Sequence, residues 1–249
     1  MPIYALTDNI YFPPPDTAEA NGLLAFGGDL SPVRLLNAYR LGIFPWYSEG
    51  EPILWWSPDP RLVLLPAEFH LSRRLARTLR GGRFTVSADR CFAQVIARCA
   101  ATRLANREGT WITQEMQEAY CLMHTLGYAH SVECWQDGCL VGGLYGMALD
   151  QVFFGESMFS LAPDASKAAL ATLVYHAEKL RIGMIDCQMR TEHLLRLGAV
   201  EMPRADFQRR LQHLACHIEP QPPWVCLSLP TSPWPGQRRS GAPPRPDAP

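Results

Sequence analysis

The sequence predicts an α+β fold with a mixed, mostly antiparallel sheet flanked by helices. Three strand-like runs, at residues 130–136, 139–148 and 151–160, follow one another with only short turn sequences between them. Such turns between apolar runs are typical of an antiparallel meander. A helical pattern over 164–180 follows, and then a further strand-like run over 184–189. Strands first in a hairpin series and then alternating with helices place the chain in the α+β class.

Residues 1–62 are rich in Pro, Gly and Trp and predict a small N-terminal domain of turns and short strands. The helical pattern of this region lies over residues 32–41. Ser31 is suited to cap its start, Pro32 is suited to its first turn, and Gly42 follows its end.

Residues 63–219 are predicted to form the main domain. Within helix 71–79 the residues Leu71, Leu75 and Leu79 share one face, as an amphipathic helix requires. The remaining elements outside the meander are predicted as strands over 61–66 and 84–87 and helices over 91–100, 113–126, 191–197 and 204–217.

The last part of the chain, residues 220–249, is dominated by Pro, Ser, Gly and Arg. This composition cannot bury enough apolar surface to form a core, so the tail is predicted to be largely disordered. Residues 224–229, from Trp224 to Leu229, are the part of it expected to dock on the main domain.

The composition is that of a soluble globular protein, with 249 residues, 47% hydrophobic and 19% charged, and a net charge of −1. We find no apolar run long enough to span a membrane and no signal peptide, so a cytoplasmic protein is expected. The scattered cysteines form no regular framework and are expected to be reduced. His213, Cys216 and His217 have a spacing found in metal ligands, but no second cluster accompanies them, and no metal site is predicted.

Arginine is concentrated between residues 71 and 107, where nine arginines occur with the single acid Asp89. A local basic surface on a nearly neutral protein indicates a polyanionic partner. The alternative is a solvated helix face, because the chain has only two lysines and arginine is its general basic residue.

Two carboxylates, Glu156 and Asp186, lie in apolar, strand-like surroundings. A buried carboxylate costs several kcal/mol unless hydrogen bonds or charges compensate, so each needs a structural partner or a ligand. The two acids lie about thirty residues apart with a helical stretch between them, and this spacing suggests that both belong to one site.

Asp186 and Gln188 are two residues apart, so strand alternation places both on one face and Cys187 on the other. An amide beside a carboxylate can orient it and help to hold a nucleophilic amine. The alternative is a strand end at which both residues meet water. Cys187 has no identifiable histidine partner, which argues against a catalytic thiol.

Glu156 follows Gly155, at which a strand can kink or accept a ligand, and Phe153 and Met158 beside it are suited to an apolar pocket. The alternative is that the aromatic residues are plain core and that Glu156 pairs with an arginine. Trp46 and Trp111 lie in Pro- or Gly-bounded stretches typical of stacking platforms. Trp55 and Trp56 are expected to join the N-terminal domain to the main one.

The order of a meander, a helix, a strand and a helix resembles that of acyltransferases of the N-acetyltransferase type. Those enzymes hold the pyrophosphate of coenzyme A with a glycine-rich loop at the helix start. Residues 160–167 contain no glycine, and Asp164 would repel phosphate there, so acetyl coenzyme A is not expected as the donor.

Eight blocks, spread from about residue 12 to about residue 211, closely resemble the bacterial leucyl/phenylalanyl-tRNA protein transferase family. They contain Asn21-Gly22-Leu23-Leu24-Ala25 with Gly27-Gly28-Asp29-Leu30-Ser31-Pro32, Gly42-Ile43-Phe44-Pro45-Trp46, Ile53-Leu54-Trp55-Trp56-Ser57-Pro58-Asp59-Pro60-Arg61, Gly109-Thr110-Trp111-Ile112-Thr113, Val141-Gly142-Gly143-Leu144-Tyr145-Gly146, Gly155-Glu156-Ser157-Met158-Phe159-Ser160, Ala165-Ser166-Lys167 and Ile185-Asp186-Cys187-Gln188.

The resemblance implies transfer of leucine or phenylalanine from its tRNA to the α-amino group of proteins that begin with Arg or Lys, which marks them for N-end-rule degradation. It implies an N-acetyltransferase-like main domain, no metal or coenzyme, and a protein that needs to be no more than a monomer. Asp186 and Gln188 would hold the attacking amine, and Glu156 would be a site carboxylate near the amino acid.

The resemblance also implies the substrate contacts. Trp46 and Trp111 would stack on the terminal adenosine and Tyr120 would contact it, while the arginines would follow the acceptor-stem phosphates. The residues expected to contact the aminoacyl group are Leu144, Phe153, Gly155, Ser157, Met158, Leu173 and Ile185, and those expected to contact tRNA phosphates are Arg73, Arg74, Arg77, Arg80 and Arg83. Two alternatives remain: a noncatalytic tRNA-binding module, and a related transferase that adds residues to cell-wall peptides.

Overall fold

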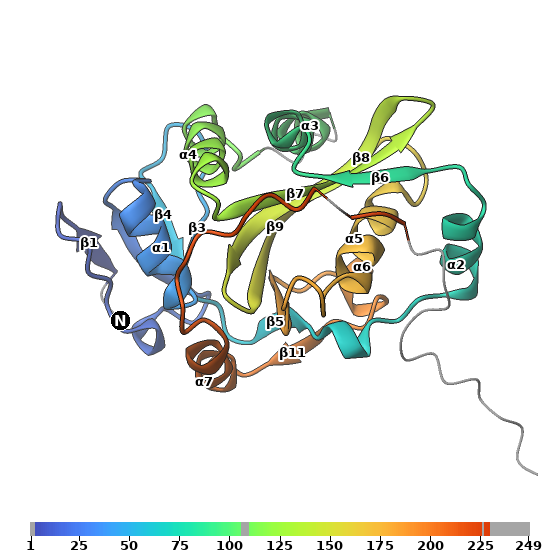
Figure 1. Ribbon diagram of the computed structural model, residues 1–249. Helices are drawn as coiled ribbons and strands as arrows, with labels where there is room; N and C mark the ends of the chain where they lie inside the picture. The colour runs from blue at the N-terminus through green and yellow to red at the C-terminus, as the bar shows by residue number, and fades with distance from the viewer. Residues whose placement is uncertain (1–2, 106–109, 226, 230–249) are drawn as a thin grey trace, which may run out of the picture.

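The computed structural model describes residues 3–105, 110–225 and 227–229. Two β-sheets organise these residues (Figure 1). The smaller sheet has the order β1-β2-β4-β3, with the bounds Tyr4–Leu6, Leu23–Gly27, Leu54–Trp56 and Phe44–Pro45. The larger has the order β11-β5-β10-β9-β8-β7-β6, with the bounds Val200–Met202, Arg61–Leu64, Met184–Gln188, Val152–Ser160, Cys139–Leu149, Ala129–Gln136 and Thr85–Ala88.

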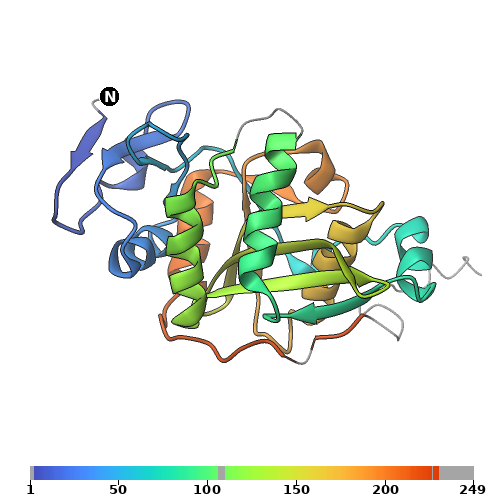
Figure 2. The same ribbon diagram turned by 90° about the horizontal axis from the view of Figure 1, so that it is seen from above.

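Helices cover both faces of the larger sheet (Figures 1 and 2). Helices α3 and α4 pack on one face and α5 on the other. The α-helices are α1 (Pro32–Arg40), α2 (Arg73–Arg80), α3 (Phe92–Ala105), α4 (Gln114–Thr125), α5 (Ala165–Tyr175), α6 (Glu192–Leu195) and α7 (Arg204–Leu214), and the 3-10 helices are η1 (Pro15–Thr17) and η2 (Pro66–Glu68).

Local sequence explains where several helices begin. Ser31, Ser72, Thr113 and Thr191 each accept a hydrogen bond from a backbone N–H of the first helical turn, as N-cap residues do. The predicted cap of α1 by Ser31 is therefore confirmed.

The two faces of the larger sheet belong to two apolar clusters. The cluster under α3 and α4 joins side chains of the N-terminal region, such as Tyr39 and Trp55, to Tyr120 and Phe154 of the main region. The cluster under α5 contains Phe153. Because the first cluster is continuous across both sheets, the smaller sheet is fixed against the larger one by buried apolar contacts. Trp55 is completely buried in this cluster, and its expected role in joining the two predicted domains stays a prediction.

The predicted α+β class and the meander of β7, β8 and β9 followed by α5, β10 and further helices are confirmed. Two helices differ from their predicted bounds by five residues, since α3 continues to Ala105 and α5 ends at Tyr175, and α6 and α7 are about three residues shorter than predicted. Strand β11 was not predicted, because three residues are too few to show alternation. The predicted boundary between residues 62 and 63 falls inside β5, and the division into domains stays a prediction.

The C-terminal residues that the structure describes are docked on the main domain, as expected for Trp224 to Leu229. Trp224 and Leu227 are both buried. Residues 230–249, which were predicted to be disordered, lie outside the described residues. Within the described ranges, no helix is long and apolar enough to cross a membrane.

Two irregularities in the sheet shape the region between β9 and β10. These strands pair in parallel only from Met184 opposite Val152 to Asp186 opposite Phe154, although β9 continues to Ser160. Beyond that pair the strands are no longer hydrogen-bonded neighbours. In β9, Gly155 pairs with Gly146 and Ser157 with Tyr145, so Glu156 is the extra residue of a β-bulge.

Candidate active site

A cavity of about 430 Å³ lies where β9 and β10 separate. Its walls come from β3, β8, β9 and β10 and from the helices α3, α5 and α6. The lining residues are Phe44, Pro45, Trp46, Arg103, Trp111, Leu144, Tyr145, Phe153, Gly155, Glu156, Ser157, Met158, Leu170, Ile185, Cys187, Gln188, Met189, Thr191, His193 and Leu194. Most of this wall is apolar, and Glu156 contributes the one carboxylate among these lining residues.

Glu156 is almost fully buried, and three polar side chains surround its carboxyl group. The Tyr120 hydroxyl donates to one oxygen at 3.1 Å, and the Gln188 amide donates to the other at 2.9 Å. Tyr39 hydrogen-bonds in turn to the Tyr120 hydroxyl. Burial, with a smaller contribution from the nearby charge of Asp186, raises the pKa of Glu156 to about 7, although the hydrogen bonds of Tyr39, Tyr120 and Gln188 act in the opposite direction. Glu156 can therefore exchange a proton near neutral pH.

Asp186 is completely buried and forms a two-point ion pair with Arg61. Arg61 Nε and Nη2 donate to the two carboxylate oxygens at 2.8 and 2.6 Å. The Arg61 guanidinium also lies 4.8 Å from the ring centres of both Phe44 and Phe207. The arginine partner that the sequence alternative gave to Glu156 thus belongs to Asp186. Asp186 does not line the cavity, and its direct contact with an amine stays a prediction.

Gln188 connects the two acids. Its backbone N–H donates to Asp186 Oδ1 at 2.9 Å, while its side chain donates to Glu156. Gln188 has a φ of +61°, and the pairing of β10 with β5 shifts register between Asp186 and Gln188. The predicted strict alternation therefore fails here, and Cys187 lines the cavity together with Gln188. Burial raises the pKa of the Cys187 thiol far above its ordinary value, so the thiol stays protonated.

The predicted apolar pocket is largely assembled. Leu144, Phe153, Met158 and Ile185 line the cavity together, as do the predicted Gly155 and Ser157. Leu173 does not: it is completely buried in the core beneath α5, and Leu170, one helical turn earlier, lines the cavity instead. Helical periodicity alone could not decide which leucine of α5 faces the cavity, because both lie on the same side of the helix.

The predicted aromatic platforms Trp46 and Trp111 line the cavity, and Trp46 is 38% exposed. The guanidinium of Arg103 lies 5.9 Å from the centre of the Trp111 ring. Tyr120 differs from its predicted role, because it is completely buried and does not line the cavity. Its hydroxyl is directed at Glu156 and not at a position open to adenosine.

The arginines predicted to contact tRNA are exposed on α2 and the loop that follows it. Arg83 donates to Gln136, and Arg74 lies 3.9 Å from Asp164. Helix α2 lies at the end of the larger sheet that is farther from the smaller sheet (Figure 1). The exposed group is Arg73, Arg74, Arg77, Arg80 and Arg83. These side chains are free to meet a large polyanion.

Several residues of the site were missed from the sequence. Arg61 carried a signal, since it ends a motif block, but its partner is 125 residues away and no spacing rule connects them. Arg103 was noted only as one of many arginines. Tyr145, which was also missed, lines the cavity beside the predicted Ser157, and the hydroxyl oxygens of both are buried without a hydrogen-bond partner among the described residues.

His213, Cys216 and His217, whose spacing is found in metal ligands, lie at the end of α7 and just after it. The backbone N–H groups of Cys216 and His217 both donate to Asp150 at 3.2 Å and fix the chain after α7. No group of three or more His, Cys, Asp or Glu side chains suited to a metal ion occurs in the described part of the chain.

Comparison with known proteins decides the family. The model of the leucyl/phenylalanyl-tRNA protein transferase family matches residues 63–212, and the model of its N-terminal domain matches residues 28–59. The chain belongs to the leucyl/phenylalanyl-tRNA protein transferase family. It is therefore an aminoacyltransferase that takes its aminoacyl group from tRNA and transfers it to a protein.

Relatives in this transferase family match almost end to end. The leucyl/phenylalanyl-tRNA–protein transferase of Syntrophotalea carbinolica is 57% identical over 223 residues, which cover 90% of this chain and 97% of the relative. That of Desulfatibacillum aliphaticivorans is 60% identical over 207 residues, which cover 83% of this chain and 89% of the relative.

Solved structures similar to this transferase are more distant. The C-terminal domain of a putative lysylphosphatidylglycerol synthetase from Agrobacterium fabrum aligns with a TM-score of 0.40 and 13% identity, over 80% of this chain and 65% of that one. A GCN5-related N-acetyltransferase from Kribbella flavida aligns with a TM-score of 0.30 and 14% identity, over 67% and 58%.

Proposed function

We propose that this protein transfers leucine or phenylalanine from aminoacyl-tRNA to the α-amino group of proteins that begin with Arg or Lys, and so marks them for N-end-rule degradation. The observation that carries the proposal is an apolar cavity with one ionisable carboxyl, Glu156, whose pKa is about 7. The protein would act as a monomer in the cytoplasm.

The donor is an activated ester, so the reaction needs positioning more than a strong base. The amine nitrogen attacks the ester carbonyl carbon, the carbon–nitrogen bond forms, and the bond to the ribose oxygen breaks. Glu156 accepts a proton from the amine as it attacks, because its pKa is close to the 7.7 to 8.0 of an ordinary α-amino group. Glu156 then passes this proton to the departing ribose oxygen, so that its carboxylate is restored.

Gln188 positions Glu156, and Asp186 and Arg61 in turn position Gln188. The Gln188 amide fixes Glu156, and the Gln188 backbone is fixed by Asp186, which Arg61 holds at two points. We therefore assign the larger part of the proton transfer to Glu156. Asp186 then acts by holding the Gln188 turn and by raising the pKa of Glu156 through its charge.

The donor's side chain would enter the apolar wall formed by Leu144, Phe153, Met158, Leu170 and Ile185. Leucine and phenylalanine gain by burial there, whereas polar or charged side chains lose hydration that this wall cannot replace. The wall therefore favours large apolar amino acids.

The tRNA would be held by stacking and by charge. Trp46 and Trp111 offer rings at the cavity mouth for the terminal adenosine, and base stacking is worth roughly 1 to 3 kcal/mol per base. The α2 arginines and Arg83 would follow the backbone phosphates without reading the base sequence, which suits an enzyme that serves several tRNAs.

The decisive test offers the protein leucyl-tRNA that carries labelled leucine, with two otherwise identical folded substrates. One substrate begins with Arg and the other with Met. We expect label on the Arg substrate only. Label on neither substrate would contradict the proposal. A third reaction that contains a cell-wall peptide precursor then separates the alternatives, because label on the precursor indicates the cell-wall transferase and label nowhere indicates a tRNA-binding module.

A further inference from the structure

The described residues that follow α7, 219–225 and 227–229, run past the turn between β8 and β9 toward the end of α5 (Figure 1), and Trp224 and Leu227 belong to the apolar cluster under α5. This segment forms hydrogen bonds at three places: just after α4, in the turn between β8 and β9, and at the end of α5. Gln221 N–H donates to the Gly127 carbonyl at 2.7 Å and its side chain to the Asp150 carbonyl at 3.3 Å. Farther on, the Ser228 carbonyl lies 2.9 Å from His176 Nε2. These contacts fix the segment on both sides of Trp224.

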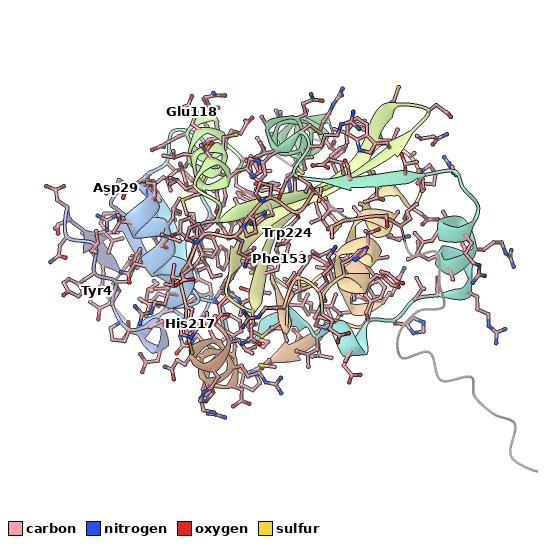
Figure 3. All side chains as sticks on the ribbon, viewed as in Figure 1. Tyr4, Asp29, Glu118, Phe153, His217 and Trp224 are labelled. Carbon is pink, nitrogen blue, oxygen red and sulfur yellow. The ribbon has the colours of Figure 1, made fainter. Side chains whose placement is uncertain are left out.

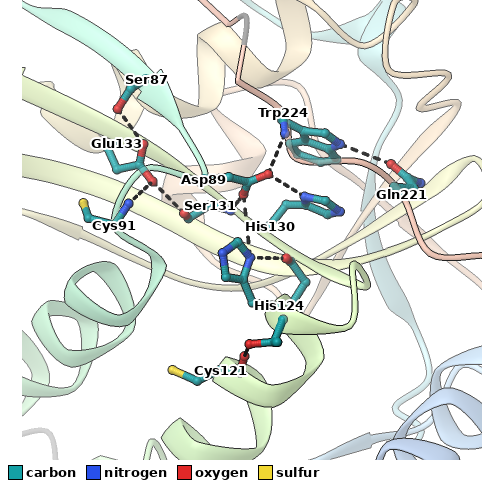
Figure 4. A network of polar contacts seen from close by, with 12 residues as sticks. Ser87, Asp89, Cys91, Cys121, His124, His130, Ser131, Glu133, Gln221 and Trp224 are labelled. Atoms are coloured by element: carbon teal, nitrogen blue, oxygen red, sulfur yellow. Dashed lines mark hydrogen bonds and ion pairs between the residues drawn. The ribbon is translucent and has the colours of Figure 1, made fainter.

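A polar pocket of the main domain receives Trp224 (Figure 4). The Trp224 backbone N–H donates to Asp89 Oδ2 at 2.7 Å, and the same oxygen lies 2.7 Å from His130 Nδ1. The indole ring stacks on the His130 ring at 4.2 Å with an angle of 4° between the planes, and its N–H donates to Gln221. Trp224 is 5% exposed, so its position is closely defined.

The Trp224 indole also packs against Phe153, which lines the cavity of the candidate active site (Figure 3). The two ring centres are 5.7 Å apart, and Trp224 itself does not line the cavity. Toward β8 the Phe153 ring is in direct contact with the backbone, because a Cβ atom on Gly146 would lie 2.6 Å from Phe153 Cζ. The ring therefore cannot shift toward β8, and Trp224 prevents its displacement on another side.

We propose that Trp224 is a positioning residue for donor selectivity: it holds the Phe153 ring in place and thereby sets how large an aminoacyl side chain the cavity accepts. This inference rests on the proposed function, because it takes the apolar cavity as the donor pocket. Removing the indole leaves space into which the Phe153 ring can retreat. The cavity then becomes deeper, and the larger phenylalanyl group gains relative to the leucyl group.

The test compares kcat/KM for phenylalanyl-tRNA and leucyl-tRNA in the wild type, Trp224→Phe and Trp224→Ala. We expect the ratio of the two values to rise about tenfold in Trp224→Ala, since about one methylene of fit in an apolar pocket changes selectivity by roughly 10-fold or more. Trp224→Phe keeps an aromatic ring against His130, so its ratio should lie between those of the wild type and Trp224→Ala. Val225→Ala changes an exposed neighbour in the same segment and should keep the wild-type ratio.

A purely structural role of Trp224 would give a different result, because partial unfolding lowers both kcat/KM values equally and leaves their ratio unchanged. That outcome would overturn the inference. If Trp224→Ala does not fold, a cycle of Trp224→Phe with Phe153→Leu decides. Trp224→Phe should raise the ratio when residue 153 is Phe. In the Phe153→Leu background the same change should alter the ratio by less than about twofold. A wild type that is inactive with both donors would instead contradict the proposed function.

Discussion

At the scale of single residues, Glu156 combines burial with three polar neighbours, and this combination places its pKa near neutral pH. Its carboxyl can be neutral while the site is empty and ionise when an amine hydrogen-bonds to it. Asp186, in contrast, is held as one half of a buried ion pair with Arg61. The two acids therefore differ in chemistry although both lie in apolar strands.

Replacing Glu156 by Gln tests the raised pKa through its effect on the free energy of unfolding. The pKa of Glu156 rises from an ordinary 4.5 to about 7 on folding. A carboxyl of raised pKa contributes stability that is fully present below pH 4.5 and is lost as the pH rises through about 7. Between pH 4.5 and pH 8 the wild type should therefore lose about 3 kcal/mol of unfolding free energy relative to Glu156→Gln.

Urea unfolding of both proteins at the two pH values measures this difference. Glu178→Gln, which removes an exposed carboxylate, is the control and should follow the wild type at both pH values. An equal stability difference between wild type and Glu156→Gln at pH 4.5 and pH 8 would contradict the raised pKa.

The sequence could predict those parts of the site that depend on neighbouring residues in the chain, but not those that depend on contacts between distant ones. An acid in an apolar run is a local feature, and it led correctly to the cavity for Glu156, Phe153 and Met158. The pairing of Arg61 with Asp186 is not local, because β5 and β10 become neighbours only in the folded sheet. The sequence therefore indicated both acids, but it did not indicate the arginine that pairs with Asp186.

At the scale of elements, the meander was predictable because the residues between its strands are strong turn formers. Asp137 and Asp150 both adopt a positive φ, which Asp tolerates better than most residues. The two bulges were not predictable, because each depends on how a partner strand pairs. Those at Glu156 and after Asp186 decide which side chains face the cavity, so the site was less predictable than the fold.

Helix α2 carries a prediction of its own, which is that it binds tRNA through charge. Arg73→Ala with Arg77→Ala should weaken tRNA binding at low salt and reduce the slope of log affinity against log salt by about 1 to 2, since each phosphate contact contributes roughly 0.7 to 0.9. Filter binding over a salt series measures the slope.

The matched control for α2 removes two exposed arginines from other helices, Arg40→Ala with Arg210→Ala. This pair changes the net charge by the same amount on α1 and α7, away from α2 (Figure 1). Equal slopes for both double variants would mean that overall charge, and not the α2 surface, attracts the tRNA.

At the scale of the whole molecule, one guanidinium joins three parts of the fold. Arg61 lies on β5, pairs with Asp186 on β10, and contacts the rings of Phe44 in the smaller sheet and Phe207 on α7. Together with the continuous core under α3 and α4, it makes the two sheets mechanically dependent on each other. The chain should therefore unfold as one unit.

Arg61→Met should lower the free energy of unfolding by about 3 to 5 kcal/mol, because it leaves Asp186 buried without its partner. Adding Asp186→Asn to Arg61→Met should recover part of this loss, because no unpaired charge remains. Guanidinium chloride unfolding, followed by tryptophan fluorescence and by far-UV circular dichroism, measures both and should give coincident curves. Two separated transitions would show that the sheets fold independently.

The bulge at Glu156 separates two parts of strand β9, and Phe153 and Ser157 on its two sides have different neighbours behind the cavity wall. Phe153, before the bulge, packs toward Trp224, whereas Tyr145 and Ser157, which pair after it, lie beside Cys99 and α3. A change in the wall near Phe153 therefore need not move the acid. Substitutions behind Phe153 can therefore reshape this wall of the cavity while the bulge keeps Glu156 on Tyr120 and Gln188.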